Sequence, residues 1–200
     1  NYVEPKSMRR YSRNRDEEWQ NSTRMTNEKK FSRFLLEIEY TASTDYYQFF
    51  EYPEKARWIL KIITNHCPTC GHQLEEGDER GTMTLGFKND KKEYREVIKY
   101  LKKYLEEDRF DLWDDFPNSR LRMFQIRSIE SDVIELHIET KHLNCPKGTM
   151  EFENKKEIED LLNFLKSELN EAESLEKEEY PRIKKWHDDN QKQRETAEKA

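Results

Sequence analysis

The chain has 200 residues, of which 39% are charged and 34% hydrophobic, and its net charge is −6. This composition is lean in apolar residues and predicts one packed domain of about 140 residues with polar segments at both ends. No apolar run approaches the roughly 18 residues that a membrane-spanning helix needs, so a membrane span is excluded. The acidic net charge also argues against nucleic acid as the partner of the molecule as a whole.

The N-terminal segment differs in charge from the rest of the chain. Residues 1–33 hold nine Lys or Arg against five acidic residues, a net charge of +4, which leaves −10 for the remainder. We expect residues 1–30 to form a basic, partly ordered arm that lies along a phosphate backbone or on an acidic protein surface. Its candidate contact residues are Arg9, Arg10 and Arg13, and a solvated leader without a partner is the alternative.

The next part of the chain predicts three strands followed by a helix. Apolar residues alternate with polar ones near residues 34–40 and 82–87, while residues 57–64 are apolar on both faces. A helix is expected after Asn89 and Asp90, which can cap it. Its apolar residues recur at helical spacing at positions 94, 97, 98, 101, 104 and 105.

The link between the two halves of the chain, residues 108–118, is acidic and aromatic. Trp113 and Phe116 stand beside Asp114 and Asp115. Large rings among carboxylates suit docking onto a basic, grooved partner, so these four residues are candidates for partner binding. The alternative is that the rings fill the seam between the halves.

The second half repeats the pattern of the first. Strands are expected near 121–129, 134–138 and 148–152, followed by a helix with apolar residues from 158 to 169. The tripeptide Gly-Thr-Met occurs at 81–83 and again at 148–150, each time before a strand and a helix. We therefore expect a duplicated domain over residues 31–170, with halves at about 31–107 and 119–170. Residues 171–200 predict a charged helical tail, either solvated or docked on a partner.

The strongest chemical signal is a set of zinc ligands. Cys67 and Cys70 flank a Pro-Thr pair and precede Gly71, and His142 and Cys145 stand at the same spacing far downstream. Two thiolates two residues apart at a Pro/Gly turn are typical of half a tetrahedral zinc site, and the second pair can supply the other half. The alternatives for the fourth ligand are His137 and His72. A Cys3His set also accepts iron.

This zinc site predicts both the cell compartment and the architecture. Three cysteines cannot all form disulfides, and no secretory leader opens the chain, so we expect a reducing setting such as the cytoplasm. The predicted fold is α+β: strand, strand, zinc turn, strand and helix, repeated twice, with antiparallel sheets and one structural zinc clamping the halves. Four protein ligands leave no open position for water, which argues against a catalytic zinc.

Two functions from different classes fit these patterns. The sequence favours a non-enzymatic, zinc-stabilised interaction protein that binds, and inhibits or adapts, a partner protein through acidic and aromatic surfaces. The alternative is a nucleic-acid-binding protein or Mg²⁺-dependent nuclease, because Glu139-Thr140-Lys141 resembles the Glu-x-Lys element of restriction-type nucleases. In that case Glu139 would hold the metal and Lys141 would assist the attacking water. The simpler interpretation makes Glu135, His137 and Glu139 the outer face of an amphipathic strand.

Overall fold

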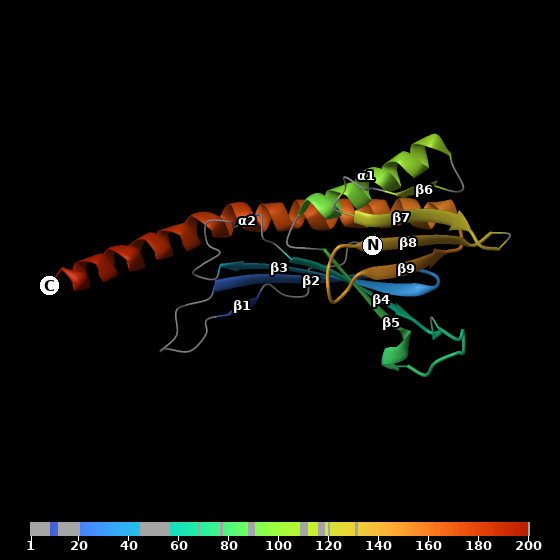
Figure 1. Cartoon of the computed structure of the whole chain (residues 1–200), viewed down its shortest axis with the longest axis horizontal. Coiled ribbons are helices and arrows are strands. Elements are labelled where there is room, and N and C mark those ends of the chain that lie inside the picture. Colours follow the sequence, from blue (N-terminus) through green and yellow to red (C-terminus); the bar gives the residue numbers. More distant parts are fainter. Residues whose placement is uncertain are drawn as a thin grey trace.

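The computed structural model describes residues 9–11, 21–44, 57–67, 69–76, 78–87, 91–108, 112–115, 119, 121–130 and 132–199. Within these ranges the chain has an α+β fold built from two antiparallel sheets, each followed by a long helix (Figure 1). The predicted fold class is confirmed at this level. The predicted zinc clamp is not shown.

The first sheet has five strands in chain order, and its last strand leads into the first helix. Residues 34, 36, 38 and 40 are buried and the residues between them are half-buried, as the alternating pattern predicted. A short 3-10 turn, η2 (Glu79–Gly81), precedes the last strand. The elements are β1 (Arg9–Tyr11), β2 (Asn21–Lys30), β3 (Phe34–Thr44), β4 (Arg57–Thr64), β5 (Thr82–Phe87) and α1 (Lys91–Glu107).

The second sheet has four strands, again in chain order, and its last strand leads into the second helix. The β8 strand alternates strictly between buried and half-buried residues. Asn154 caps the second helix by accepting the backbone N–H of Glu157 over 3.0 Å. The elements are β6 (Leu112–Asp115), β7 (Leu121–Ser128), β8 (Ile134–Thr140), β9 (Lys147–Phe152) and α2 (Lys155–Glu198).

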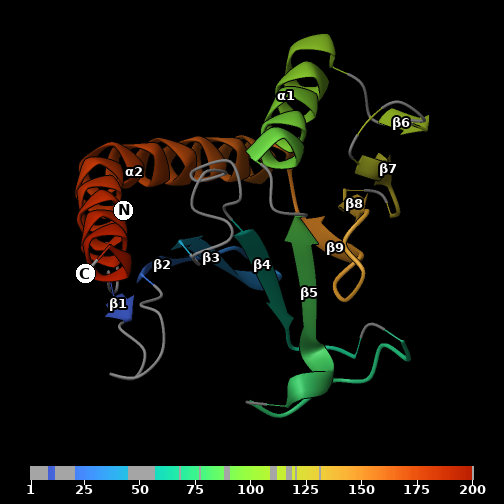
Figure 2. The ribbon, with the colours of Figure 1, turned by 60° about the vertical axis from the view of Figure 1, so that its left-hand side comes forward.

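Two strands lie where the sequence predicted none, and one helix joins two segments that were predicted as a helix and a separate helical tail. Residues 21–30, expected in the N-terminal arm, form the full-length strand β2, which pairs with β3 along ten positions. Residues 112–115 of the expected link form β6 at the edge of the second sheet. The α2 helix runs through Pro181 to Glu198, although proline removes one backbone donor from the helix interior. Figure 2 shows that this helix changes direction along its length.

The core lies between the sheets and the two helices, which cover one side of both sheets (Figures 1 and 2). Aromatic residues join the layers: the rings of Trp58 on β4 and Tyr94 on α1 stack with centroids 4.1 Å apart. The Tyr94 hydroxyl donates to the carbonyl of Leu165 on α2 over 2.9 Å, which links the two helices. The fully buried apolar residues of α2 end at Ala172 among those whose burial is described.

A hydrogen-bonded seam joins the two sheets. Gly86 of β5 donates its N–H to the carbonyl of Cys145 over 2.9 Å, and its carbonyl accepts the Thr140 hydroxyl over 2.6 Å. On β9, Gly148 lies so close to the first sheet that an added Cβ would stand 2.8 Å from Ile62 Cδ1. The edge strands β5 and β9 therefore meet, whereas β1 and β6 lie at the edges away from the seam.

Candidate functional site

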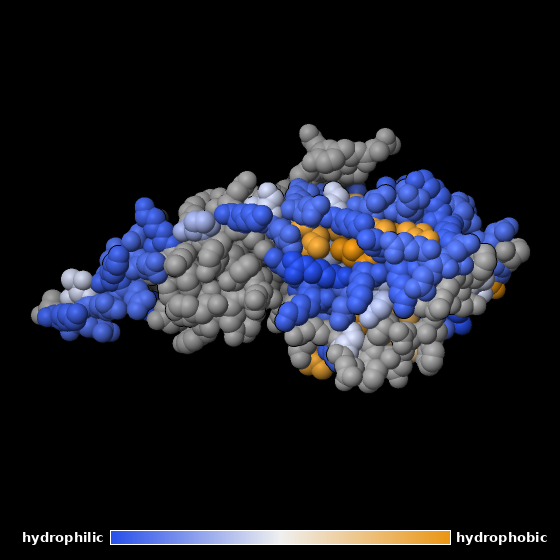
Figure 3. All heavy atoms as spheres, turned by 90° about the horizontal axis from the view of Figure 1, so that it is seen from above, coloured by the Kyte–Doolittle hydropathy of each residue, from blue (hydrophilic) through white to orange (hydrophobic). Residues whose placement is uncertain are grey.

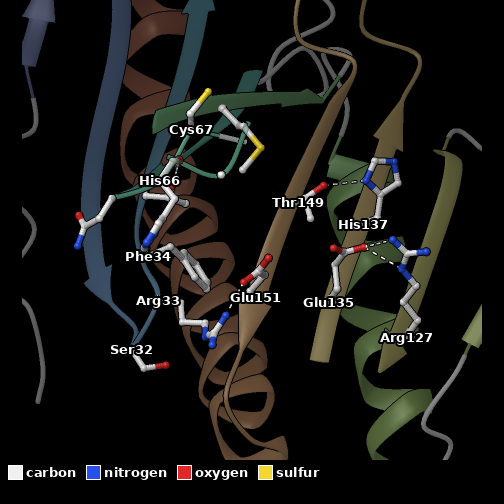
Figure 4. A pocket seen from close by; sticks show the side chains of 14 residues that line it. Ser32, Arg33, Phe34, His66, Cys67, Arg127, Glu135, His137, Thr149 and Glu151 are labelled. Carbon is white, nitrogen blue, oxygen red and sulfur yellow. Dashed lines mark hydrogen bonds and ion pairs between the residues drawn. The ribbon is translucent and has the colours of Figure 1, made fainter. Parts of the chain in front are cut away.

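A cleft of about 760 Å³ opens between one end of the first sheet and the outward face of the second (Figure 4). The first sheet contributes the starts of β3 and β5, the end of β4 and the loop that follows it. The second sheet contributes polar side chains of β7, β8 and β9. The lining residues are Ser32, Arg33, Phe34, Thr64, Asn65, His66, Cys67, Gly71, Met83, Arg127, Glu135, His137, Thr149 and Glu151.

The charged side chains of the cleft are bonded across neighbouring elements. Arg127 on β7 holds Glu135 on β8 through its Nε and Nη2 atoms, at 2.9 and 2.8 Å. Arg33, just before β3, contacts Glu151 of β9 at 2.7 Å, so this ion pair spans the two sheets. Alternation along each strand puts these groups on the face opposite the core. The cleft therefore presents positive and negative charge close together.

His137 is one of the polar side chains that the second sheet contributes to the cleft. Its Nε2 lies 3.0 Å from Glu139 Oε1 and its Nδ1 lies 2.9 Å from the Thr149 hydroxyl. Because an ionised carboxylate only accepts hydrogen bonds, Nε2 donates to Glu139, and in the neutral ring Nδ1 then accepts from Thr149. Both ring nitrogens therefore form hydrogen bonds within the sheet, and His137 is a hydrogen-bonded residue on the outer face of β8.

The cysteine turn, residues 67–71, stands at the rim of the cleft. The N–H of Cys67 donates to the carbonyl of His72 over 2.9 Å, and the N–H of Gly71 donates to the carbonyl of Cys67 over 2.8 Å. Gly71 has φ +72°, a conformation that glycine adopts without a Cβ penalty. The result is a tight turn that carries both Cys67 and Cys70.

The surroundings of Cys67 favour its thiolate form. The pKa of Cys67 is lowered, first by the backbone N–H of Cys70 and then by that of Thr69 and by the Cys70 side chain. The guanidinium of Arg80 also interacts with both thiols, and Asp78 holds it through hydrogen bonds of 2.6 to 3.1 Å. The turn therefore fits two of the four ligands of a zinc ion.

The structure does not gather the second predicted ligand pair at the cysteine turn. His142 and Cys145 pack on Gly86. A Cβ added to that glycine would stand 3.0 Å from the His142 ring. The His142 Nδ1 accepts the backbone N–H groups of Asn144 and Cys145 over 3.2 and 3.1 Å, which leaves the hydrogen of the neutral ring on Nε2. Within the described ranges, no three His, Cys, Asp or Glu side chains lie so that they could hold a metal ion.

The residues of the nuclease alternative are bonded in separate places. Glu139 accepts from the His137 ring at 3.0 Å, while the Lys141 ammonium donates to the carbonyl of Ser119. The structure therefore engages Glu139 and Lys141 with different neighbours.

The predicted partner-binding residues fall at the sheet edges or outside the described residues. Arg9 and Arg10 lie in β1, where they pair in register with Arg24 and Thr23. Trp113, Asp114 and Asp115 lie in β6, the far edge of the second sheet. Phe116 and Arg13 are outside the described residues. The basic and the acidic segments are thus at the two sheet edges that face away from the seam.

Sequence patterns did not reveal the cleft as a site. Glu135, His137 and Glu139 match the simple expectation for the outer face of a strand, and all three are half-buried. The cross-sheet partners Arg33 and Glu151 are 118 positions apart and share no local motif. The only available signal was the polar side of each strand, which most half-exposed strands have.

No helix in the described part of the chain is both long enough and apolar enough to span a membrane. Comparison of the chain with protein-family models, with curated proteins and with solved structures gave no match in any of the three.

Proposed function

We propose that this chain is a non-enzymatic, zinc-stabilised interaction protein whose cleft binds an extended segment of a partner protein. The observation that carries the proposal is the cleft itself, which is bounded by charged side chains on the second sheet and by Phe34 and Met83 on the first. Phe34 is buried and Met83 half-buried, so the surface of the cleft is mainly polar, with charges of both signs that suit a charged, extended peptide.

The ion pairs of the cleft support peptide binding more than they support catalysis. Arg127 and Glu135 are bonded to each other, as are Arg33 and Glu151, and three of these four side chains are 39 to 52% exposed. Exposed pairs of this kind contribute only about 0–1 kcal/mol each, so a bound segment can replace one partner at small cost. Each pair then offers one positive and one negative contact to a charged peptide.

Zinc at the cysteine turn has a structural role in this proposal. Cys67 and Gly71 line the rim of the cleft, and the turn belongs to the 17-residue connection between β4 and β5. A metal ion on Cys67 and Cys70 would hold this rim in one conformation. We further infer that the two sheet-and-helix halves are duplicates, because each runs through the same order of strands, turn, strand and helix.

Site-specific photo-cross-linking in the native host tests the proposed function. A photoreactive amino acid at Asn65, an exposed residue that lines the cleft, is compared with the same group at Ser167, an exposed residue of α2 outside it. We expect a defined polypeptide adduct at Asn65 that is lost in the variant Arg127→Ala and is absent at Ser167. Equal adducts at both positions, or adducts that consist of nucleic acid, would contradict the proposal.

A further inference from the structure

The cysteine turn presents two thiol donors. The N–H of Cys67 donates to the carbonyl of His72 over 2.9 Å and the N–H of Gly71 donates to the carbonyl of Cys67 over 2.8 Å, so backbone hydrogen bonds close the turn that carries Cys67 and Cys70. Both cysteines are free thiols. Zinc binds four ligands in a tetrahedron at about 2.3 Å from each sulfur, so one turn satisfies half of its coordination.

The same chain does not supply the other half within its described residues. No third His, Cys, Asp or Glu joins the two thiols there, although His66 and His72 belong to the same loop. His142 and Cys145 are held on Gly86 of β5. The end of β5 nearest the cysteine turn is Thr82, four positions before Gly86, which corresponds to about 13 Å along the strand. The Cys145 carbonyl accepts the Gly86 N–H at the seam, and the His142 ring accepts the Cys145 N–H, so both residues are held there.

The turn is accessible to another molecule. Residues 69–73 are all exposed, and Cys67 is half-buried. Figure 2 shows the β4–β5 connection extending away from α1 and α2, at the lower end of the first sheet. A second turn of the same sequence can approach along this direction without meeting the helices.

A second copy of the chain is the occupant that the chemistry favours. Two identical turns related by a twofold axis give four thiolates, a complete tetrahedral ligand set for one zinc ion. Each copy also brings Arg80, whose guanidinium interacts with both thiols and lies beside Asp78.

We propose that Cys67 and Cys70 of two copies bind one zinc ion between them, so that the protein is a zinc-linked dimer. The inference rests on the zinc of the proposed function and names the molecule that completes its coordination. Cys67 stands at the rim of the cleft, so the dimer contact would adjoin the peptide site, and each is tested by its own measurement: zinc content and mass for the dimer, cross-linking at Asn65 for the cleft.

The test is zinc content and native mass of the full chain, purified in a phosphine reductant that keeps thiols reduced. We expect one zinc per two chains and a mass of twice 24.5 kDa. A chelator should give the monomer, and added Zn²⁺ should restore the dimer. A dimer that the reductant abolishes, or one that persists after zinc removal, would overturn the proposal.

Two variants separate this proposal from a site within one chain. Cys70→Ser should lose both zinc and the dimer, whereas Cys145→Ser should keep both. One zinc per monomer that is lost in Cys145→Ser would overturn the dimer and establish a clamp within one chain. A monomer without zinc would overturn zinc binding as well, while cross-linking at Asn65 would still report on the cleft. Circular dichroism of both variants checks that they fold.

Discussion

Asn27 on β2 donates hydrogen bonds from its amide nitrogen to both carboxyl oxygens of Glu168 on α2, over 2.9 and 2.8 Å. Both side chains are buried, and the same nitrogen reaches Glu171 at 3.3 Å. The Asn27 Oδ1 is buried without a hydrogen-bond partner in the described structure. The hydrogen bonds from Asn27 favour the charged carboxylate, whereas the burial of Glu168 favours the protonated, uncharged carboxyl group.

The burial of Glu168 predicts a loss of stability as the pH rises. Burial raises the pKa of Glu168 to about 7, the hydrogen bond from Asn27 opposes this, and the charge of Glu171 adds to it. Because the folded state holds a proton that the unfolded chain releases near pH 4.5, the free energy of unfolding falls between about pH 4.5 and 7. The loss is on the order of 2–3 kcal/mol. Chemical denaturation at pH 5 and pH 8 measures it.

The variant Glu168→Gln should remove most of this pH dependence, because its side chain stays neutral. Glu159→Gln, at an exposed position of the same helix, is the control and should leave the dependence unchanged. The groups that interact with Glu168 are Asn27, Glu171 and Tyr94, so no other element contributes a described charge at this contact. Equal pH dependence in Glu168→Gln and in the unchanged protein would contradict the assignment.

The Asn27 contact also explains which strands the sequence could predict. The β3 and β8 strands alternate cleanly between apolar and polar residues, and both form as expected. In β2 a core position holds Asn27, whose burial makes sense only once Glu168 is opposite it, 141 residues later. A local pattern therefore could not distinguish β2 from a polar arm.

The close approach of Gly148 to the first sheet predicts a steric effect. A Cβ on residue 148 would stand 2.8 Å from Ile62 Cδ1 and 3.2 Å from Leu85 Cβ, so Gly148→Ala should destabilise the fold by about 1–3 kcal/mol. Ile62→Val removes the nearest atom and alone should cost about 0.5–1.5 kcal/mol. In the double variant the two costs should be less than additive, which denaturation of all four proteins measures. Strict additivity would show that the two residues do not meet.

The hydrogen bond at Gly86 in the seam predicts that removal of the Thr140 hydroxyl destabilises the protein. Thr140 is fully buried and donates to the Gly86 carbonyl over 2.6 Å. Thr140→Val keeps the shape but leaves that carbonyl without its donor, so it should destabilise the protein by about 1–3 kcal/mol. Thr84→Val, a half-buried position of β5, is the matched control and should cost less. Equal melting temperatures for the two variants would contradict a hydrogen-bonded seam.

In the candidate site, too, local sequence patterns predict some features and miss others. The tight turn at Cys67 and Cys70 could be predicted from their spacing around a Pro/Gly pair, because the geometry of such a turn is local, while its metal binding stays a prediction. The relation of these cysteines to His142 and Cys145 could not be predicted, because Gly86 holds that pair at the seam. The cleft depends on how two sheets lie against each other, which no single strand encodes.

The exposure of the C-terminal part of α2 predicts that this part can be deleted without loss of the fold. The residues from Lys177 to Lys199 whose burial is described are all exposed, and Figure 3 shows hydrophilic surface at this end. Deleting residues 177–200 should therefore shift the melting temperature by less than about 3 °C. Deleting residues 171–200 also removes Ala172 and the Glu173 ion pair with Arg95, and should cost clearly more. Similar melting temperatures for the two truncations, or unfolding of the shorter deletion, would show that the packing of α2 does not end near Ala172.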